Sequence, residues 1–183
     1  MTVDPRFYAP LGALTLGQIA ELTDAVMEGD GDLPVTGIAS AANAQAGDLA
    51  FLDGNGKSAP EISANAGIFV TNEANLQYVP DGASKLVTRF PRYAHSVAAL
   101  AMYKPRHLDW TGEARISPDA QVHEGAHVSP GAVIGPGAVV GEGSWIGPNA
   151  SLGPGVQVGR HCQIGANTSV FCALLGDHVT LLA

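Results

Sequence analysis

The chain has 183 residues, of which 46% are hydrophobic and only 14% are charged, so it can bury one or two compact cores. The net charge of −8 is spread over both halves, with 7 basic against 12 acidic residues in 1–110 and 2 against 5 in 111–183. Neither half offers a basic face, which argues against a nucleic-acid partner.

No part of the sequence is typical of a membrane or secreted protein. Its apolar stretches all fall short of the ~20 residues that span a bilayer, and no basic segment followed by an apolar run opens the chain. The two cysteines, Cys162 and Cys172, are too few for a disulfide framework and lack metal-ligand spacing. We therefore expect a cytoplasmic protein without a transmembrane segment.

The first half of the sequence predicts a small α/β domain. Its first dozen residues are expected to form a loosely attached arm, and Thr15 is the expected N-cap of a short helix. Pro91 suits the first turn of a second helix, over residues 92–103, because its missing N–H has no partner there, and Pro105 ends that helix. A further short helix is expected at residues 58–66. Strand character is found at residues 35–39, 49–52, 67–70 and 86–87.

The composition changes between Lys104 and Ile116, from mixed apolar and polar residues to Gly, Pro and Val in a strict period. We therefore place a domain boundary near residue 110. The α/β domain then occupies residues 1–109 and a repeat domain occupies residues 110–183.

An aliphatic residue returns at every sixth position in the repeat domain. A period of six fits neither an α-helix nor an open sheet and is typical of a parallel β-helix, in which each hexad supplies one short strand and one corner. The aliphatic side chain fills the interior, a small residue four positions later lets the coil bend, and the Gly that often follows the aliphatic accepts backbone angles that a Cβ would forbid. The aliphatic positions are Ile116, Val122, Val128, Ile134, Val140, Ile146, Leu152, Val158, Ile164 and Val170. The second set is Ala120, Ala126, Ala132, Ala138, Ser144, Ala150, Val156, Cys162, Thr168 and the larger Leu174.

Three hexads make one coil, so residues 116–183 supply about four coils. The period breaks once, because the aliphatic residue after Val170 is Leu175, one position early. The corner at residues 171–173 is therefore expected to be shortened or bulged. Because the sequence stops on apolar residues without a polar cap, we also expect it to be a truncated chain that lacks later coils.

Three sequence features together resemble one protein family. They are the GDLAFL strand at residues 47–52, the PRYAHSVAALAMYKP helix at residues 91–105, and the hexads with a break in ANTSVFCALLGDH at residues 166–178. In this combination the chain is similar, from about residue 14 to residue 183, to the UDP-3-O-acylglucosamine N-acyltransferases of bacterial lipid A synthesis. Many other enzymes share the hexads, so the N-terminal half makes the resemblance specific.

The resemblance implies a small α/β N-terminal domain followed by a left-handed parallel β-helix, assembled as a homotrimer. It implies transfer of a 3-hydroxyacyl group from acyl carrier protein to the 2-amine of a UDP-linked, O-acylated glucosamine, without a cofactor. The implied partners are therefore acyl carrier protein, a UDP-sugar substrate and further copies of the chain.

The resemblance also implies a uridine site in the N-terminal domain, where an aromatic residue from a strand stacks on the uracil. Phe51 matches that aromatic residue, although a core position is almost as good an interpretation. Asn55 and Lys57 match the next binding positions if one residue is inserted in FLDGNGKS, at residues 51–58. The family's Tyr then falls on Ser58, so half of the aromatic clamp is missing.

An amine that attacks a thioester needs a base, and His suits that role at neutral pH. The resemblance places the catalytic His on a later coil, beyond residue 183, so no catalytic residue is assigned here and the chain alone is expected to be inactive. Cys172 stands where relatives often carry a His. All six histidines are interpreted as packing or surface residues: His95, His107, His123, His127, His161 and His178.

Two other classes of function compete with this one. A γ-class carbonic anhydrase needs three His ligands for zinc, two of them five residues apart, whereas His123 and His127 are four apart, so no metal site is expected. The chain also fits a non-catalytic nucleotide-binding or trimerisation module, or another hexapeptide-repeat sugar acyltransferase. A further run of hexads containing a His would favour the N-acyltransferase.

Overall fold

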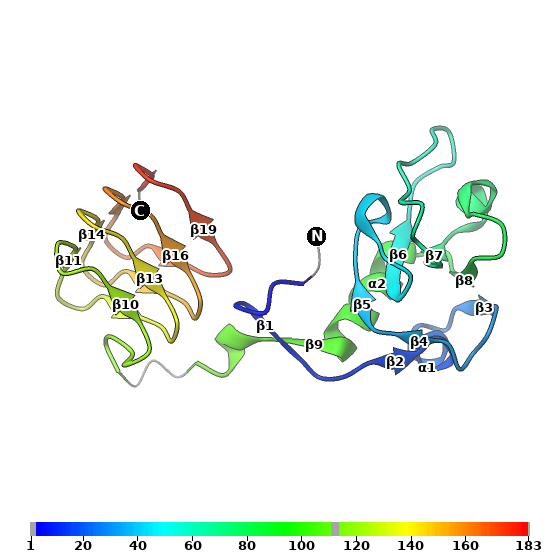
Figure 1. The fold of residues 1–183 in the computed structure, drawn as a ribbon, viewed down its shortest axis with the longest axis horizontal. Coiled ribbons are helices and arrows are strands. Elements are labelled where there is room, and N and C mark those ends of the chain that lie inside the picture. Colours follow the sequence, from blue (N-terminus) through cyan, green and yellow to red (C-terminus); the bar gives the residue numbers. More distant parts are fainter. Residues whose placement is uncertain (1–2, 111–113, 183) are drawn as a thin grey trace. The chain divides into compact units, whose positions relative to one another are not determined.

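The computed structural model describes residues 3–110 and 114–182. Their contacts divide the chain into two compact units, residues 10–104 with residue 3, and residues 4–9 with residues 105–182 (Figure 1). The division after residue 104 lies before the boundary expected near residue 110, and it assigns part of the N-terminal arm to the second unit. None of the helices in the described ranges is both long and apolar enough to cross a bilayer.

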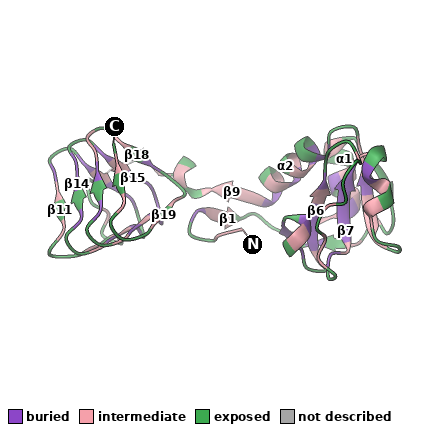
Figure 2. Cartoon of the chain, turned by 90° about the horizontal axis from the view of Figure 1, so that it is seen from above, coloured by how far each residue is buried: buried purple, intermediate pink, exposed green. Residues whose placement is uncertain are grey.

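A five-stranded sheet in the order β3-β8-β7-β6-β5 forms the centre of the first unit. The strands β5 to β8 run parallel, and β3 is antiparallel to β8 at one edge. The central strands β6 and β7 are buried on both faces, which explains their continuous apolar sequences (Figure 2). The bounds are β3 (Val26–Glu28), β5 (Gly37–Ile38), β6 (Asp48–Leu52), β7 (Ile68–Thr71) and β8 (Ser84–Val87).

Two α-helices accompany this sheet, α1 (Leu16–Thr23) and α2 (Pro91–Met102). A capping box starts α1: the Thr15 hydroxyl accepts the Gln18 N–H at 3.2 Å, and the Gln18 side-chain oxygen accepts the Thr15 N–H at 2.9 Å. The second helix begins at Pro91, as expected, and packs on α1, β6 and β7.

The prediction of a helix at residues 58–66 is wrong, because that segment has no helix and a 3₁₀ helix, η2 (Glu73–Tyr78), forms after β7 instead. The Asn72 side chain caps η2 by accepting the Asn75 N–H at 3.1 Å. The remaining elements before the repeats are β1 (Tyr8–Pro10), β2 (Leu14–Thr15), β4 (Pro34–Val35), η1 (Ala41–Asn43), β9 (Tyr103–Pro105) and η3 (Arg106–Leu108). Of these strands, β1 pairs with β9 and β2 with β4.

The second unit consists of short strands in three parallel sheets, ordered β10-β13-β16-β19, β11-β14-β17-β20 and β12-β15-β18 (Figure 1). Each strand pairs with the third strand after it, as in a parallel β-helix with three strands in every coil. This arrangement is consistent with the expected left-handed β-helix. The strands are β10 (Gln121–Val122), β11 (His127–Val128), β12 (Val133–Ile134), β13 (Val139–Val140), β14 (Trp145–Ile146), β15 (Ser151–Leu152), β16 (Gln157–Val158), β17 (Gln163–Ile164), β18 (Ser169–Val170), β19 (Leu174–Leu175) and β20 (Thr180–Leu181).

The interior of the coils follows the sequence pattern. The six aliphatic residues from Ile134 to Ile164 are at most 2% exposed, and the small residues from Ala132 to Cys162 are also buried, whereas Thr168 is partly buried. Ser144 is the polar member of this core, and its hydroxyl donates to the Gly159 carbonyl at 2.8 Å and accepts the Cys162 N–H at 2.9 Å. The prediction that both sets of residues face inward is confirmed in these hexads.

The glycines that follow the aliphatic residues have a different role from the expected one. Their φ angles lie outside the left-handed region, so the prediction based on backbone angles is wrong. A Cβ on Gly135 would instead lie 2.8 Å from the backbone of the next coil at Gly153, and one on Gly141 would lie 2.6 Å from the Gly159 carbonyl oxygen. These glycines allow neighbouring coils to approach each other.

From Gly131 to Asn167, left-handed backbone occurs two positions later in each hexad, at the turn itself. Gly137 and Gly155 have φ angles of 66° and 70°, and Asn149 and Asn167 take the same conformation at 57° and 58°. Pro often precedes this position, as in a type II turn. Asn is the non-glycine residue that tolerates this conformation best.

The break in the period is confirmed. The strand pairs before the break have an offset of eighteen residues, whereas Val158 pairs with Leu175 and Ile164 pairs with Leu181, both at seventeen. The shortened corner changes which residue faces inward: Ala173 packs against the core and Leu174 is 50% exposed. The prediction that Leu174 occupies the inward position is therefore wrong, because that prediction kept the period of six across the deletion.

The expectation that the first dozen residues form a loosely attached arm is also wrong. Phe7 is only 6% exposed and belongs to the apolar core of the β-helix. The Arg106 N–H donates to the Phe7 carbonyl at 2.9 Å, and the Arg106 Nε donates to the Pro5 carbonyl at 2.8 Å. The arm is thus part of the second unit.

Candidate functional site

The predicted uridine site begins with Phe51, near the carboxyl end of β6. Its side chain is partly buried and packs on the first turns of α2. The ring centroid lies 4.8 Å from that of His95, and the Arg92 guanidinium carbon lies 5.5 Å over the ring. Neither neighbour is predictable from the sequence, since both lie about forty residues downstream and no local pattern connects them to β6.

His95 is held in place by the backbone beside this ring. Its Nε2 donates to the Leu49 carbonyl at 3.1 Å. Burial lowers the pKa of His95, outweighing the hydrogen bonds to the Leu49 and Ala39 carbonyls that raise it. The imidazole is therefore neutral at pH 7 and acts as a packing residue, as the sequence analysis interpreted it.

Arg92 lies over the Phe51 ring and forms an ion pair with Asp53. Its Nε lies 3.2 Å from Asp53 Oδ2, and its side chain is 74% exposed. A surface ion pair of this kind contributes about 0–1 kcal/mol to stability, so Arg92 can move without large cost. The Phe51 ring thus has a movable planar cation above it.

The loop after β6 carries Asn55 and Lys57, both exposed. The Asn55 side-chain oxygen accepts the Lys57 N–H at 3.1 Å, which gives the loop a local turn. The Gly54 carbonyl accepts the side-chain amides of Asn72 and Asn75 at 3.0 and 3.1 Å. These bonds attach the loop to η2, whereas Phe51 packs on α2.

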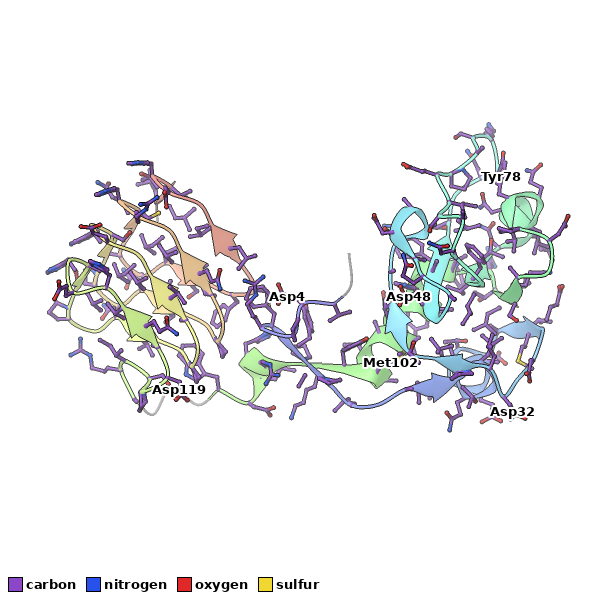
Figure 3. All side chains as sticks on the ribbon, viewed as in Figure 1. Asp4, Asp32, Asp48, Tyr78, Met102 and Asp119 are labelled. Carbon is purple, nitrogen blue, oxygen red and sulfur yellow. The ribbon has the colours of Figure 1, made fainter. Side chains whose placement is uncertain are left out.

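Tyr78, labelled in Figure 3, supplies the second anchor of this loop. Its hydroxyl donates to the Gly56 carbonyl at 2.8 Å, and Gly56 itself lies against the Ala74 carbonyl. Ser58, at the position of the missing clamp Tyr, is exposed. The sequence analysis also missed Tyr78, which has no spacing relation to FLDGNGKS.

Two cavities lie at the carboxyl edge of the sheet. One, of about 550 Å³, is bounded by Val26 of β3, residues 72–74 after β7 and residues 87–89 at the end of β8. The other, of about 410 Å³, is bounded by Asp53 after β6 and residues 89–93 at the start of α2. In open α/β sheets, ligands bind outside the carboxyl ends of the parallel strands. Both cavities therefore occupy the expected place for a ligand.

The second unit has a cavity of about 630 Å³ on one row of its corners. Pro136–Gly137 and Pro154–Gly155 form one wall, and Arg6, Arg106 and Trp110 form another. Asp109 and Asp119 also line this cavity, so opposite charges are mixed within it. This charge distribution does not select one class of ligand.

The histidines of the β-helix are exposed at its corners and strands. His123 Nδ1 accepts the Gly125 N–H at 3.0 Å, and His127 stacks on Trp145 with ring centroids 6.3 Å apart. His161 and His178 stack on successive coils at 5.2 Å. Among residues 3–110 and 114–182, no group of three or more His, Cys, Asp or Glu is placed to hold a metal ion.

The two cysteines differ in environment. Cys162 is buried, and its Sγ donates to the Gly176 carbonyl at 3.1 Å. Cys172 is exposed on the shortened corner with a φ of 51°. Neither thiol has a base beside it in the contacts of the described residues, so neither is arranged as a nucleophile.

The coils around these side chains match a known family model. Residues 137–172, which run from β13 to β18, match the model described as bacterial transferase hexapeptide (six repeats). This match covers the coils with the most regular interior and ends at the shortened corner. Residues 137–172 of the β-helix are therefore similar to the hexapeptide repeats of bacterial transferases.

Proposed function

We propose that the protein functions in the transfer of a 3-hydroxyacyl group from acyl carrier protein to the 2-amine of UDP-3-O-acylglucosamine, a cytoplasmic step of lipid A synthesis. The observation that carries this proposal is the combination of transferase-type hexapeptide coils with a separate unit that presents Phe51 near the carboxyl edge of a parallel sheet. The coils favour acyl transfer, and the first unit favours a nucleotide-linked substrate.

The uridine would bind at Phe51, with Asn55 and Lys57 contributing from the following loop. A half-buried aromatic ring on a strand end offers a rigid surface for stacking. Because Ser58 cannot provide a second ring, uracil must displace the Arg92 side chain or stack against it. The exposed position of Arg92 permits either arrangement.

The chemical step requires a base. The amine nitrogen attacks the thioester carbonyl, the C–S bond breaks, the thiol of the carrier leaves, and the amine loses a proton. His95 is unsuited to this step because burial lowers its pKa and the Leu49 carbonyl occupies its Nε2. We assign the base to no residue in 3–110 or 114–182.

The homotrimer is part of the same proposal. His127 and Trp145 face outward on neighbouring coils, and Trp145 is 40% exposed. An exposed, stacked aromatic pair on a flat sheet is a suitable surface for contact with a second copy. Sedimentation of the purified chain measures its oligomeric state directly.

Calorimetric titration with UDP tests the nucleotide assignment. We expect Phe51→Ala to weaken UDP binding by about tenfold or more, because base–aromatic stacking contributes about 1–3 kcal/mol. Phe171→Ala, a change of the same type in the second unit, should leave UDP binding unchanged. Equal binding by wild type and Phe51→Ala would remove uridine from this site.

An assay with acyl carrier protein thioester and the UDP-sugar tests the catalytic assignment. We expect no turnover above background from the 183 residues alone, since no base is assigned among the described residues. Turnover by this chain would show that the base lies within it. UDP binding without turnover in every longer form of the protein would favour the alternative of a non-catalytic nucleotide-binding module.

A further inference from the structure

Arg89 joins the two cavities at the carboxyl edge of the first unit. It lies two residues after the end of β8 and lines both the cavity of about 550 Å³ and the cavity of about 410 Å³. The carboxyl ends of β6, β7 and β8 all lie at this edge, because these strands run parallel. A ligand that extends through both cavities would pass the Arg89 guanidinium.

Arg89 has no carboxylate partner among the described residues. Nearby cations have carboxylate partners: Arg92 pairs with Asp53 at 3.2 Å, and Lys85 pairs with Glu28 at 2.8 Å. Within the part of the chain that the structure describes, no carboxylate forms an ion pair with Arg89, whose guanidinium carbon lies 5.4 Å over the Phe90 ring. Arg89 therefore remains available to an external anion.

The residues that line the two cavities indicate which chemical groups of a ligand each cavity would accept. Phe90 and Tyr93, which line the smaller cavity, are 61% and 67% exposed and offer apolar surface beside the two arginines. The larger cavity contains Glu73, which disfavours an anion there, together with the polar side chains of Asn72 and Thr88. The smaller cavity holds two arginines, Arg89 and Arg92, against the single carboxylate of Asp53, whereas the larger cavity holds Arg89 against Glu73. The anion thus belongs in the smaller cavity, and a further uncharged part of the ligand extends into the larger one.

We propose that Arg89 binds a phosphate group of an organic phosphate that occupies these two cavities. A guanidinium is suited to this role because its planar fork makes two parallel hydrogen bonds to phosphate oxygens. Arg92, released from Asp53, is close enough in the chain to add a second contact. The phosphate could belong to a nucleoside diphosphate, a source that rests on the proposed function, or to a phosphopantetheine arm. Both ligands present the same phosphate chemistry to Arg89.

Titrations of the full 183-residue chain with inorganic pyrophosphate, UDP, uridine and 4′-phosphopantetheine test this proposal. We expect Arg89→Ala to weaken pyrophosphate binding by about tenfold or more, since a hydrogen bond to a charged group contributes about 1.5–3 kcal/mol. Arg89→Lys should bind with intermediate affinity, because it keeps the charge and loses the fork. Arg160→Ala, which removes an exposed, ion-paired arginine from the second unit, is the matched control and should bind as wild type does.

The organic ligands identify the source of the phosphate. A nucleotide source predicts that Arg89→Ala weakens UDP binding and leaves uridine binding unchanged, whereas a carrier source predicts a loss for phosphopantetheine alone. Pyrophosphate affinity that is absent, or equal in wild type and Arg89→Ala, would overturn the proposal. Failure of uridine to bind, with pyrophosphate binding still dependent on Arg89, would instead refute the uridine assignment and leave the phosphate site standing.

Discussion

The ring of Phe171 lies over Gly153, in the position that a Cβ on residue 153 would occupy. Phe171 is the first residue of the shortened corner, and its centroid lies 5.6 Å from that of His107 and 6.0 Å from that of Trp110. The deletion of one residue therefore directs an aromatic side chain along the outside of the coils to the segment that precedes them. The shortened corner thus packs the Phe171 ring against His107 and Trp110 within the second unit.

Replacing Phe171 with Ala should loosen this segment. We expect a loss of about 2 kcal/mol in the unfolding free energy of the second unit, less than the ~3–5 kcal/mol of a fully buried Phe, because the ring is 40% exposed. Both tryptophans of the chain, Trp110 and Trp145, lie in this unit, so a Trp145→Phe background leaves Trp110 as the sole reporter. Its emission should shift to longer wavelength in Phe171→Ala, and an unchanged emission would contradict the contact.

Phe7 should be essential to the stability of the second unit. Its side chain is 6% exposed in the β-helix core, so Phe7→Ala leaves a cavity and should cost about 3 kcal/mol or more. Urea unfolding followed by tryptophan fluorescence measures this loss. Arg6→Ala is the control from the same arm, because it removes an exposed ion pair with Asp4 and should change stability by less than about 1 kcal/mol. Equal stability of the two variants would mean that the arm is detached in solution.

The contrast between these residues shows what the sequence can predict. Ile134 and Ile146 were placed correctly in the interior because a period of six has one physical meaning, an aliphatic side chain returning to the same side of a coil. Phe7 could not be placed, because its contacts are made with residues more than one hundred positions later and no local pattern records them. Leu174 was misplaced because a deleted residue changes the direction of the next side chain.

The candidate site was predictable to a smaller extent. Phe51 could be identified from a resemblance in FLDGNGKS, which is a contiguous segment. Its neighbours Arg92 and His95 depend on how α2 packs on β6, and the attachment of the loop by Tyr78 depends on a 3₁₀ helix that the sequence did not predict. When a site is assembled from several elements of a sheet, the sequence therefore predicts only the residues within the contiguous motif.

The two kinds of glycine in the coils should respond differently to substitution. Gly135→Ala places a methyl group 2.8 Å from the next coil, and relieving that overlap should cost about 1–3 kcal/mol. Gly137→Ala meets no neighbour, and its φ of 66° should cost about 1–2 kcal/mol. Gly137→Asn should recover most of that loss, because Asn149 and Asn167 already adopt this conformation, whereas Gly135→Asn should recover nothing. Thermal unfolding of the four variants distinguishes the close approach from the turn, and recovery at both positions would contradict the assignment.

His95 should make the first unit less stable in mild acid. Burial lowers the pKa of His95 in the folded chain below the ordinary value of 6.5 for a free imidazole, so above pH 6.5 both states hold a neutral imidazole and the residue causes no pH dependence. As the pH falls below 6.5 the unfolded chain takes up a proton that the folded chain resists, so the free energy of unfolding decreases until the folded pKa is passed. Amide hydrogen exchange of α2, measured at pH 7.5 and pH 5 and corrected for intrinsic rates, should report this decrease as lower protection at pH 5. The His95→Gln variant should lose this pH dependence and the exposed His123→Gln variant should keep it, so identical profiles for the two variants would mean that another group is responsible.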